Sequence, residues 1–380
     1  MREAGCFTWQ GPAAVELRIE RDQRTVAQAV SGLVEPAALR ALVLAGGYGR
    51  GEGGFRWHDG VPLPFNDYDY FLIVSGIGPR AMRRLRQGLR SLGHRLSAEL
   101  GLEVDFAALE ERRLHRLPVC MMYSELKWGH RALLGDSSCL QAIPGPAPSE
   151  LPLSEAARTL LNRGALLLMN EIDLRGGTIP DAERFERYLC KAILAGGEAL
   201  LAKDGLYHPL LSVRQARLAD TTGSLPAGFL ELHRGAMDYK FGARDTAVAL
   251  ATPRERQQVA VAAWSSAFAA LESRRLGRTF SDWTAQAPAS VPKGQGRAGW
   301  TGVLRHLALH AAFPHRSRWL RDMTRCAYHP RERLIAALPL LLEERGEAAP
   351  VAAARALGVA DDAAWCVAAG AFLEAWPRYC

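Results

Sequence analysis

Three apolar runs in the first third of the chain predict strands at residues 41–45, 68–74 and 103–109. Between the second and third runs, residues 80–100 repeat leucine and methionine at helical spacing, with arginines off that face, which predicts an amphipathic helix. Gly101 follows it and predicts the end of the helix. A strand, a helix and a strand of these lengths predict a crossover unit in a mixed sheet.

Beyond a proline-rich linker at 141–152, the apolar residues recur with the period of helices. The clearest predicted helix spans 181–203, and two more are predicted at about 226–241 and 252–274. Residues 281–302 are rich in Gly, Pro, Ser and Ala, which predicts a loop or a second linker. The chain after this segment is again helical by period.

Shorter features complete the pattern. Residues 22–33 predict a lead-in helix, and residues 119–123 predict a further strand. Residues 125–136 predict an element that closes the first domain, and Ser154 is predicted to cap the first helix beyond the linker.

Together these patterns predict an α+β fold, in which a mixed sheet with helices is followed by all-α helical domains. The linkers place domain boundaries near residues 150 and 280, which gives domains at 1–150, 151–280 and 281–380. A chain of 380 residues is long enough for two or three domains with a sizeable core.

The composition is that of an ordinary globular protein, with 48% hydrophobic and 23% charged residues. No apolar run reaches the length of a membrane span, and the N-terminus has no apolar signal-peptide core, so we expect a cytoplasmic protein without membrane contact. The seven cysteines show no zinc-ligand spacing, which favours reduced thiols.

The net charge of +7 permits an anionic partner without demanding one. Arginines crowd the segment 305–333, where histidines and aromatic residues lie between them, as on a polyanion-binding face. The alternative is that they form the polar side of amphipathic helices. The arginines are Arg305, Arg316, Arg318, Arg321, Arg325, Arg331 and Arg333.

Candidate chemistry lies at the start of the second apolar run. Asp67 and Asp69 are two residues apart, and side chains two apart on a strand point to the same face. Two carboxylates side by side repel each other, and a divalent metal ion is the natural means of offsetting that repulsion. A solvated turn ahead of a strand is the alternative explanation for this pair.

The motif GGYGRGE at 46–52, followed by NDYD at 66–69 and an apolar run, resembles the signature of the DNA polymerase β-type nucleotidyltransferase superfamily. The residues of the first motif are most similar to those in the nucleotidyltransferase domain of bacterial PII uridylyltransferases. The family has a third aspartate on a later strand, which Asp105 matches. The resemblance covers about residues 39–136.

The resemblance implies two Mg²⁺ ions and an NTP substrate. Asp67, Asp69 and Asp105 would be catalytic and would ligate the metal ions, with Asp105 helping to activate the acceptor hydroxyl as general base. Gly46 and Gly47 would hold the triphosphate through backbone N–H groups.

Cations are expected at the nucleotide as well. Arg50 is predicted to pair with a phosphate, or else to be a solvated loop residue. In two-domain relatives a lysine of the helical domain reaches the triphosphate, which implies Lys191, with Lys203 and Lys240 as rivals. Glu52 is expected to be a structural partner of the turn rather than a ligand.

The spacing departs from the family, because Asp67 follows Gly47 by 20 residues, several more than in most relatives. Residues 53–63 are therefore predicted to be an insertion that shapes or covers the pocket. Within it, Trp57 could stack on a base and His58 could take part in catalysis, although exposed loop residues are the favoured explanation for both.

The sequence therefore predicts a magnesium-dependent nucleotidyltransferase that acts on a hydroxyl or amine of a small molecule or a protein. One alternative is an RNA acceptor such as a tRNA end, docked through residues 305–333. The other is a module that senses nucleotides without turnover, although the presence of all three aspartates disfavours it.

Overall fold

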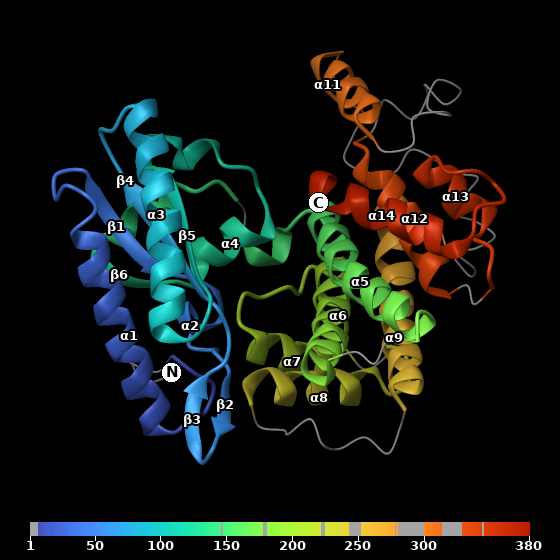
Figure 1. The fold of residues 1–380 in the computed structure, drawn as a ribbon, viewed down its shortest axis with the longest axis horizontal. Coiled ribbons are helices and arrows are strands. Elements are labelled where there is room, and N and C mark those ends of the chain that lie inside the picture. The colour runs from blue at the N-terminus through green and yellow to red at the C-terminus, as the bar shows by residue number, and fades with distance from the viewer. Residues whose placement is uncertain are drawn as a thin grey trace. The chain divides into compact units, whose positions relative to one another are not determined.

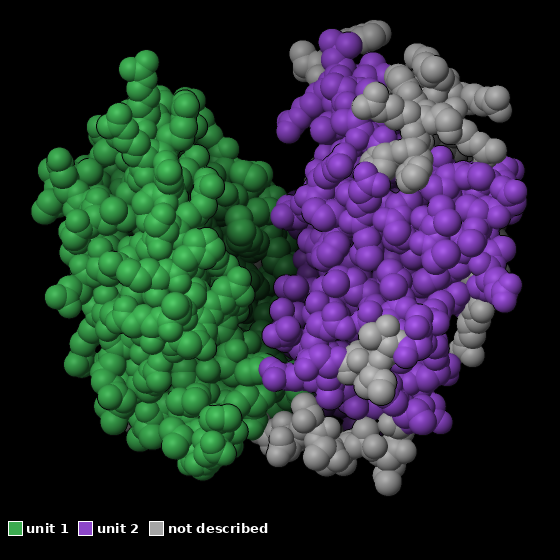
Figure 2. Space-filling model, viewed as in Figure 1, with its two compact units in different colours: residues 1–151, 207–216, 238–245 green, residues 152–206, 217–237, 246–380 purple. Residues whose placement is uncertain are grey.

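The computed structural model describes residues 7–145, 147–177, 181–221, 225–242, 252–277, 279, 300–313, 329–343 and 346–380. The chain forms two compact units (Figure 2). The first, here called the sheet unit, comprises Met1–Leu151, Tyr207–Ala216 and Asp238–Asp245, and the helical unit comprises Pro152–Leu206, Arg217–Met237 and Thr246–Cys380. The division into three domains stays a prediction, and the predicted linker at 281–302 lies almost wholly outside the described residues.

A four-stranded sheet with the order β5-β4-β1-β6 forms the centre of the sheet unit (Figure 1). Strand β4 is antiparallel to β1 and parallel to β5, so the predicted mixed sheet is confirmed. Helix α3, Pro79–Leu100, makes the predicted crossover and ends at Gly101, whose φ of 74° suits glycine. The strands are β1 Leu39–Leu44, β4 Tyr68–Val74, β5 Val104–Glu110 and β6 Arg131–Gly135.

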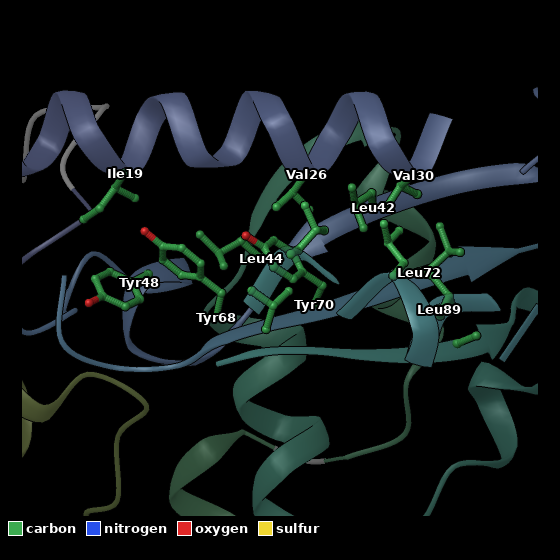
Figure 3. Packing of buried hydrophobic residues seen from close by; sticks show 14 of the residues in the cluster. Ile19, Val26, Val30, Leu42, Leu44, Tyr48, Tyr68, Tyr70, Leu72 and Leu89 are labelled. Atoms are coloured by element: carbon green, nitrogen blue, oxygen red, sulfur yellow. The ribbon is translucent and has the colours of Figure 1, made fainter. Parts of the chain in front are cut away.

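One face of the sheet packs against helix α1, Ala13–Ser31 (Figure 3). Ile19, Val26 and Val30 of α1 meet alternate strand residues such as Leu42 and Leu72. The prediction that this helix begins at residue 22 was wrong by nine residues. The polar residues Asp22 and Gln23 break the apolar pattern there. Both are buried in the core, where the Tyr68 hydroxyl donates to Asp22 over 3.0 Å and the Tyr70 hydroxyl donates to Gln23 over 2.8 Å.

The other face of the sheet packs against shorter helices. Ala41, Val43, Phe71 and Ile73 point to this side and meet Leu114, Leu126 and Leu140. These leucines belong to η1 Glu111–Arg116, α4 Met121–Trp128 and η2 Ser137–Ala142. The strand predicted at 119–123 was wrong, because a five-residue apolar run fits a helix equally well and packing of α4 against the sheet decides between them.

The predicted insertion is a β-hairpin of β2, Phe55–His58, and β3, Val61–Pro64. Asp59 and Gly60 form its two-residue turn, and both have positive φ, at 47° and 76°. Trp57 is 59% exposed on this hairpin. His58 is exposed as well.

The chain beyond the sheet is largely helical, as predicted. Helix α5 begins at Leu153 with Pro152 at its N-cap, so the cap predicted at Ser154 was wrong by two residues. Thr252 and Glu255 form a reciprocal capping box at the start of α9, which fixes that helix end by local hydrogen bonds. Among the described residues no helix has the length and apolarity to cross a membrane. The helices are α5 Leu153–Arg175, α6 Ala182–Lys203, α7 Leu211–Asp220, α8 Phe229–Phe241, α9 Pro253–Leu276, α11 Trp300–Ala311, α12 Arg331–Glu343, α13 Val351–Leu357 and α14 Trp365–Tyr379.

Two later segments complete the sheet unit. Trp9 stacks on Phe241, and the Arg56 guanidinium lies between the rings of Phe65 and Tyr239. We predict that residues 1–151, expressed alone, melt at a lower temperature than the full chain, because these contacts are lost. Circular dichroism of both proteins measures this, and equal melting temperatures would contradict it.

Candidate functional site

The candidate site lies where β4 and β5 begin. Asp69 of β4 and Asp105 of β5 are register partners on neighbouring parallel strands. Asp67 lies just ahead of β4, two residues from Asp69, so the alternation of strand side chains directs it to the same face. Asp67 and Asp105 are exposed and Asp69 is half-buried, which places the acidic ends of the two strands at the surface of the unit.

The Asp69 carboxylate is repelled by the neighbouring carboxylates, as the sequence predicted. Its burial raises its pKa first of all, and the carboxylates of Asp67 and Asp105 raise it further, to about 7. The Arg50 guanidinium, in contrast, lowers the pKa of Asp69. The three aspartates therefore interact electrostatically.

The donor chemistry fits a magnesium ion, which prefers carboxylate oxygens. In the described part of the chain, no three Asp, Glu, His or Cys side chains form a group that could hold a metal ion as they stand. The fit therefore rests on the register of Asp69 with Asp105 and on the mutual repulsion that a divalent cation would relieve. Exposed side chains such as Asp67 change rotamer within nanoseconds, so the strands fix the site while its outer ligands can turn toward an ion.

The glycine motif forms a single helical turn, α2 Gly46–Gly49, directly after β1. The Ala45 backbone N–H donates to the Asp69 carbonyl over 2.8 Å, which ties the turn to β4. Gly46 has a φ of 63°, and a Cβ there would lie 2.6 Å from Oδ2 of Asp69. Glycine at this position therefore lets the carboxylate lie against the turn.

We predict that Gly46→Ala lowers the free energy of unfolding by about 1–3 kcal/mol, from left-handed backbone strain plus displacement of Asp69. Gly76→Ala is the matched control, since Gly76 has a φ of 72° and a Cβ added there would meet no atom within 4 Å. Urea unfolding of both variants measures the difference. Equal losses would show that the contact with Asp69 is unimportant.

Arg50 is a buried ion-pair partner rather than a solvated loop residue. Its side chain is 7% exposed, and Nη1 lies 3.0 Å from Oε2 of Glu125 on α4. Its buried Nε finds no hydrogen-bond partner among the described residues. Its predicted pairing with a phosphate stays a prediction.

Glu125 is a residue that the sequence analysis missed. Tyr207 donates to its Oε1 over 2.6 Å, and Nη2 of Arg214 lies 3.9 Å from the same oxygen. Burial alone would raise the pKa of Glu125, but Arg50, Arg214 and the Tyr207 hydroxyl together lower it. The carboxylate thus stays ionised and holds Arg50 against α4. No local sequence pattern predicts these contacts, because the partners of Glu125 lie in segments far apart in the chain.

Glu52 is a structural partner of the glycine turn, as expected, because its backbone N–H donates to the Gly47 carbonyl over 2.7 Å, and its side chain binds a second element. Its carboxylate is 1% exposed and accepts from the backbone N–H groups of Leu211, at 2.7 Å, and Ser212, at 3.1 Å. The Ser212 hydroxyl donates to it over 2.8 Å. Glu52 therefore caps the first turn of α7.

The predicted lysines are spread over both units. Lys191 is exposed on α6 in the helical unit, Lys203 pairs with Asp204 over 2.6 Å, and Lys240 belongs to the sheet unit. The part of Lys191 at the triphosphate stays a prediction.

The arginine segment is described only in part. Arg331 donates to the Tyr379 carbonyl and Arg333 to the Ala356 carbonyl, so these two join helices rather than forming an open basic face. Arg305 is exposed on α11. The other four arginines, Arg316, Arg318, Arg321 and Arg325, lie outside the described residues.

No protein-family profile and no curated protein matches this sequence. Among solved structures, the fold is similar to that of spectinomycin adenyltransferase AAD(9) from Enterococcus faecialis, determined with ATP and spectinomycin. The identity is 11% and the TM-score 0.42, over 65% of this chain and 98% of that one. A likeness this distant assigns no activity, and the similarity to uridylyltransferases stays a prediction. The function proposed below therefore rests on this chain's own residues.

Proposed function

We propose that the sheet unit carries a magnesium-dependent nucleotidyltransferase site. It would move a nucleoside monophosphate from an NTP to a hydroxyl or amine of a small-molecule or protein acceptor. The observation that supports this best is the register of Asp69 with Asp105 beside a glycine turn that admits the Asp69 carboxylate. Asp67, two residues from Asp69, supplies the third carboxylate.

In the proposed reaction the acceptor oxygen or nitrogen attacks the α-phosphorus of the NTP. The bond from that phosphorus to the bridging oxygen of the β-phosphate breaks, and pyrophosphate leaves. The acceptor proton passes to the carboxylate of Asp105, which is exposed and open to an acceptor. Bound Mg²⁺, held by Asp67, Asp69 and Asp105, would supply electrostatic stabilisation of the charge on the phosphates.

Neighbouring groups are assigned supporting parts. The backbone N–H groups of Gly46 and Gly47 would take the triphosphate, because these two residues carry no side chain of their own. Arg50 is held by Glu125 close enough to affect the pKa of Asp69, which keeps a cation near the phosphates. Lys191, exposed on α6, is the lysine proposed to bind the triphosphate.

The test is incubation of the protein with each NTP, labelled on the α-phosphate, together with Mg²⁺ and a cell extract of the source organism. Label in the small-molecule or protein fraction supports the proposal, and label in RNA would favour the RNA acceptor instead. The double variant Asp67→Ala/Asp69→Ala is the control. Absence of Mg²⁺-dependent label transfer from every NTP, with nucleotide binding intact, would favour the sensing module.

A further inference from the structure

The outward side of helix α3 is covered by arginines. Six of its 22 residues are arginines and one, Glu99, is acidic, so this helix alone carries a net charge of +5 in a chain whose total is +7. All six arginines are exposed, while Met82, Leu89 and Leu96 of the same helix are buried in the core of the sheet unit. The arginine face is defined by Arg80, Arg83, Arg84, Arg86, Arg90 and Arg95.

These arginines are not neutralised by neighbouring carboxylates. Within the part of the chain that the structure describes, none of the six forms an ion pair. Helix α1, which packs on the same face of the sheet, is different, because its Arg18 pairs with Asp22 over 2.8 Å and its Arg24 pairs with Glu20 over 2.7 Å. A surface helix on this side of the sheet therefore does not require unpaired arginines.

Helix stability does not account for the arginine face. Arg80, Arg83 and Arg84 lie near the start of α3, where the partial positive charge of a helix N-terminus disfavours cations. Glu99 lies near the other end, where the helix dipole disfavours an anion. Arg80 and Arg84 are also four residues apart, a spacing at which like charges repel each other. The arginine face thus lowers the stability of its own helix, which points to a role outside folding.

Positive charge continues beyond α3 at the edge of the sheet. Nη2 of Arg86 donates to the Ala108 carbonyl of the edge strand β5 over 3.2 Å. The chain then enters η1, where the side chains of Arg112 and Arg113 are 69% and 70% exposed. Both pair with the buried carboxylate of Glu110, so one of their two positive charges is left without a counter-charge. This basic edge lies at the end of β5, whereas the carboxylates proposed to be catalytic lie at its start.

The composition of the arginine face restricts the class of its partner. Among the described residues of α3, no aromatic or large apolar side chain is exposed. Protein interfaces depend on aromatic and apolar anchors, membrane-binding helices insert apolar side chains, and single-stranded nucleic acids are bound through aromatic stacking. A nucleic-acid duplex requires none of these, because arginines bind its rows of phosphates directly.

The packing of α3 favours RNA over DNA. Helix α3 lies beside α1 on the sheet (Figure 1), and the Arg18 guanidinium of α1 donates to the Leu100 carbonyl of α3 over 2.8 Å. A helix flanked in this way does not protrude, as a helix that enters the major groove of B-DNA must. Double-stranded RNA presents a wide, shallow minor groove lined by phosphates, which a flat surface can contact.

We propose that the arginine face binds the phosphate backbone of double-stranded RNA without reading its sequence. The binding is independent of the proposed transfer reaction, because no arginine of the face belongs to the candidate site. Each arginine that neutralises a phosphate contributes about 0.9 to the salt dependence of binding on a logarithmic scale. Six such contacts predict a slope of about −5 and roughly a thousandfold loss of affinity between about 50 and 200 mM salt.

The experiment titrates a fluorescein-labelled RNA duplex of mixed sequence with the full-length protein and follows fluorescence anisotropy over this range of KCl. NTP and Mg²⁺ are left out, so the result does not depend on whether the protein is a nucleotidyltransferase. The proposal expects binding with the steep salt dependence given above. Absence of binding at the lowest salt concentration, or an affinity that does not change with salt, would overturn it.

Two double variants locate the binding. Arg83→Gln/Arg90→Gln should reduce the affinity about tenfold and the steepness of the salt slope by about 2. Arg355→Gln/Arg378→Gln is the matched control, because it removes the same charge from two exposed arginines of the helical unit. Equal losses in both would overturn the proposal. Arg84→Gln, with an expected reduction of about 1 in the slope, decides the matter if the first variant fails to fold.

Titrations with duplex DNA of the same sequence and with phosphatidylserine vesicles compare the other polyanions. The proposal expects several-fold weaker binding of the DNA and no binding of the vesicles. Equal affinity for duplex DNA would overturn the assignment to RNA. Binding of the vesicles that is lost in Arg83→Gln/Arg90→Gln would show that the arginine face contacts an anionic membrane surface instead.

Discussion

Asp69→Asn is expected to lower the rate of nucleotidyl transfer roughly a thousandfold, because it removes the central carboxylate of the three. Asp105→Asn should give a loss of similar size, since its carboxylate is in register with Asp69 and is the proposed proton acceptor. Initial rates with labelled NTP and Mg²⁺ measure both. Asp59→Asn is the matched control, because Asp59 is an exposed carboxylate in the hairpin turn.

The same variant, Asp69→Asn, should stabilise the metal-free protein near neutral pH. The pKa of Asp69 is about 7 in the folded chain, against about 4 when unfolded. Between these values the folded state binds more protons than the unfolded state, so wild-type stability falls as pH rises through this window. Asparagine removes that loss, and we expect a gain on the order of 2 kcal/mol at pH 8 that disappears below about pH 4.

Urea unfolding in buffer with a chelator, at pH 4 and pH 8, measures this gain. The Asp69 carboxylate would then be required for activity while it lowers the stability of the metal-free protein. This is expected where like charges lie close together to bind a cation. A variant that loses activity and is also less stable at pH 8 would contradict this account. In that case Asp69 would be a structural residue, and the solvated-turn explanation of the pair would regain support.

Glu52→Gln is expected to lower the free energy of unfolding by about 2–4 kcal/mol. The buried carboxylate accepts three hydrogen bonds from Leu211 and Ser212, and an amide would turn its own N–H groups toward at least one of these donors. Loss of the negative charge also removes its favourable interaction with the first turn of α7. The midpoint of urea unfolding at constant slope measures the change.

Glu20→Gln is the control for this prediction, because Glu20 forms an exposed ion pair with Arg24, and such pairs contribute about 0–1 kcal/mol. A small effect of Glu52→Gln, equal to that of Glu20→Gln, would mean that α7 does not depend on this cap. A selective loss of activity at unchanged stability would instead indicate that Glu52 acts at the reaction site.

Local sequence was sufficient to predict those helices and strands whose physical cause lies in neighbouring residues. Strand β4 has the predicted bounds, 68–74, because a continuous apolar run flanked by a turn favours a buried strand. The crossover through α3 follows from its amphipathic period and from Gly101. Helix α9, predicted at about 252–274, begins at Pro253, and the capping box that fixes this end is a contact within four residues.

Long-range contacts decided the rest. Tyr207 meets Glu125 across 82 residues, and Leu211 meets Glu52 across 159. No pattern within a helix or strand predicts such pairs, since Glu52 and Glu125 look locally like ordinary polar residues and Leu211 takes part through its backbone N–H. The start of α1 was predicted nine residues late for the same reason, because the buried partner of Asp22 is Tyr68, on a strand that only folding brings near.

The sequence by itself thus determined strands β1, β4 and β5, the glycine turn and the acidic residues of the candidate site, because periodicity and motif spacing are properties of neighbouring residues. The tertiary structure alone decided that Asp69 and Asp105 share a register, that Arg50 is held by Glu125, and that segments beyond residue 206 complete the sheet unit. Packing and buried hydrogen bonds select these contacts, and both exist only once the chain has folded.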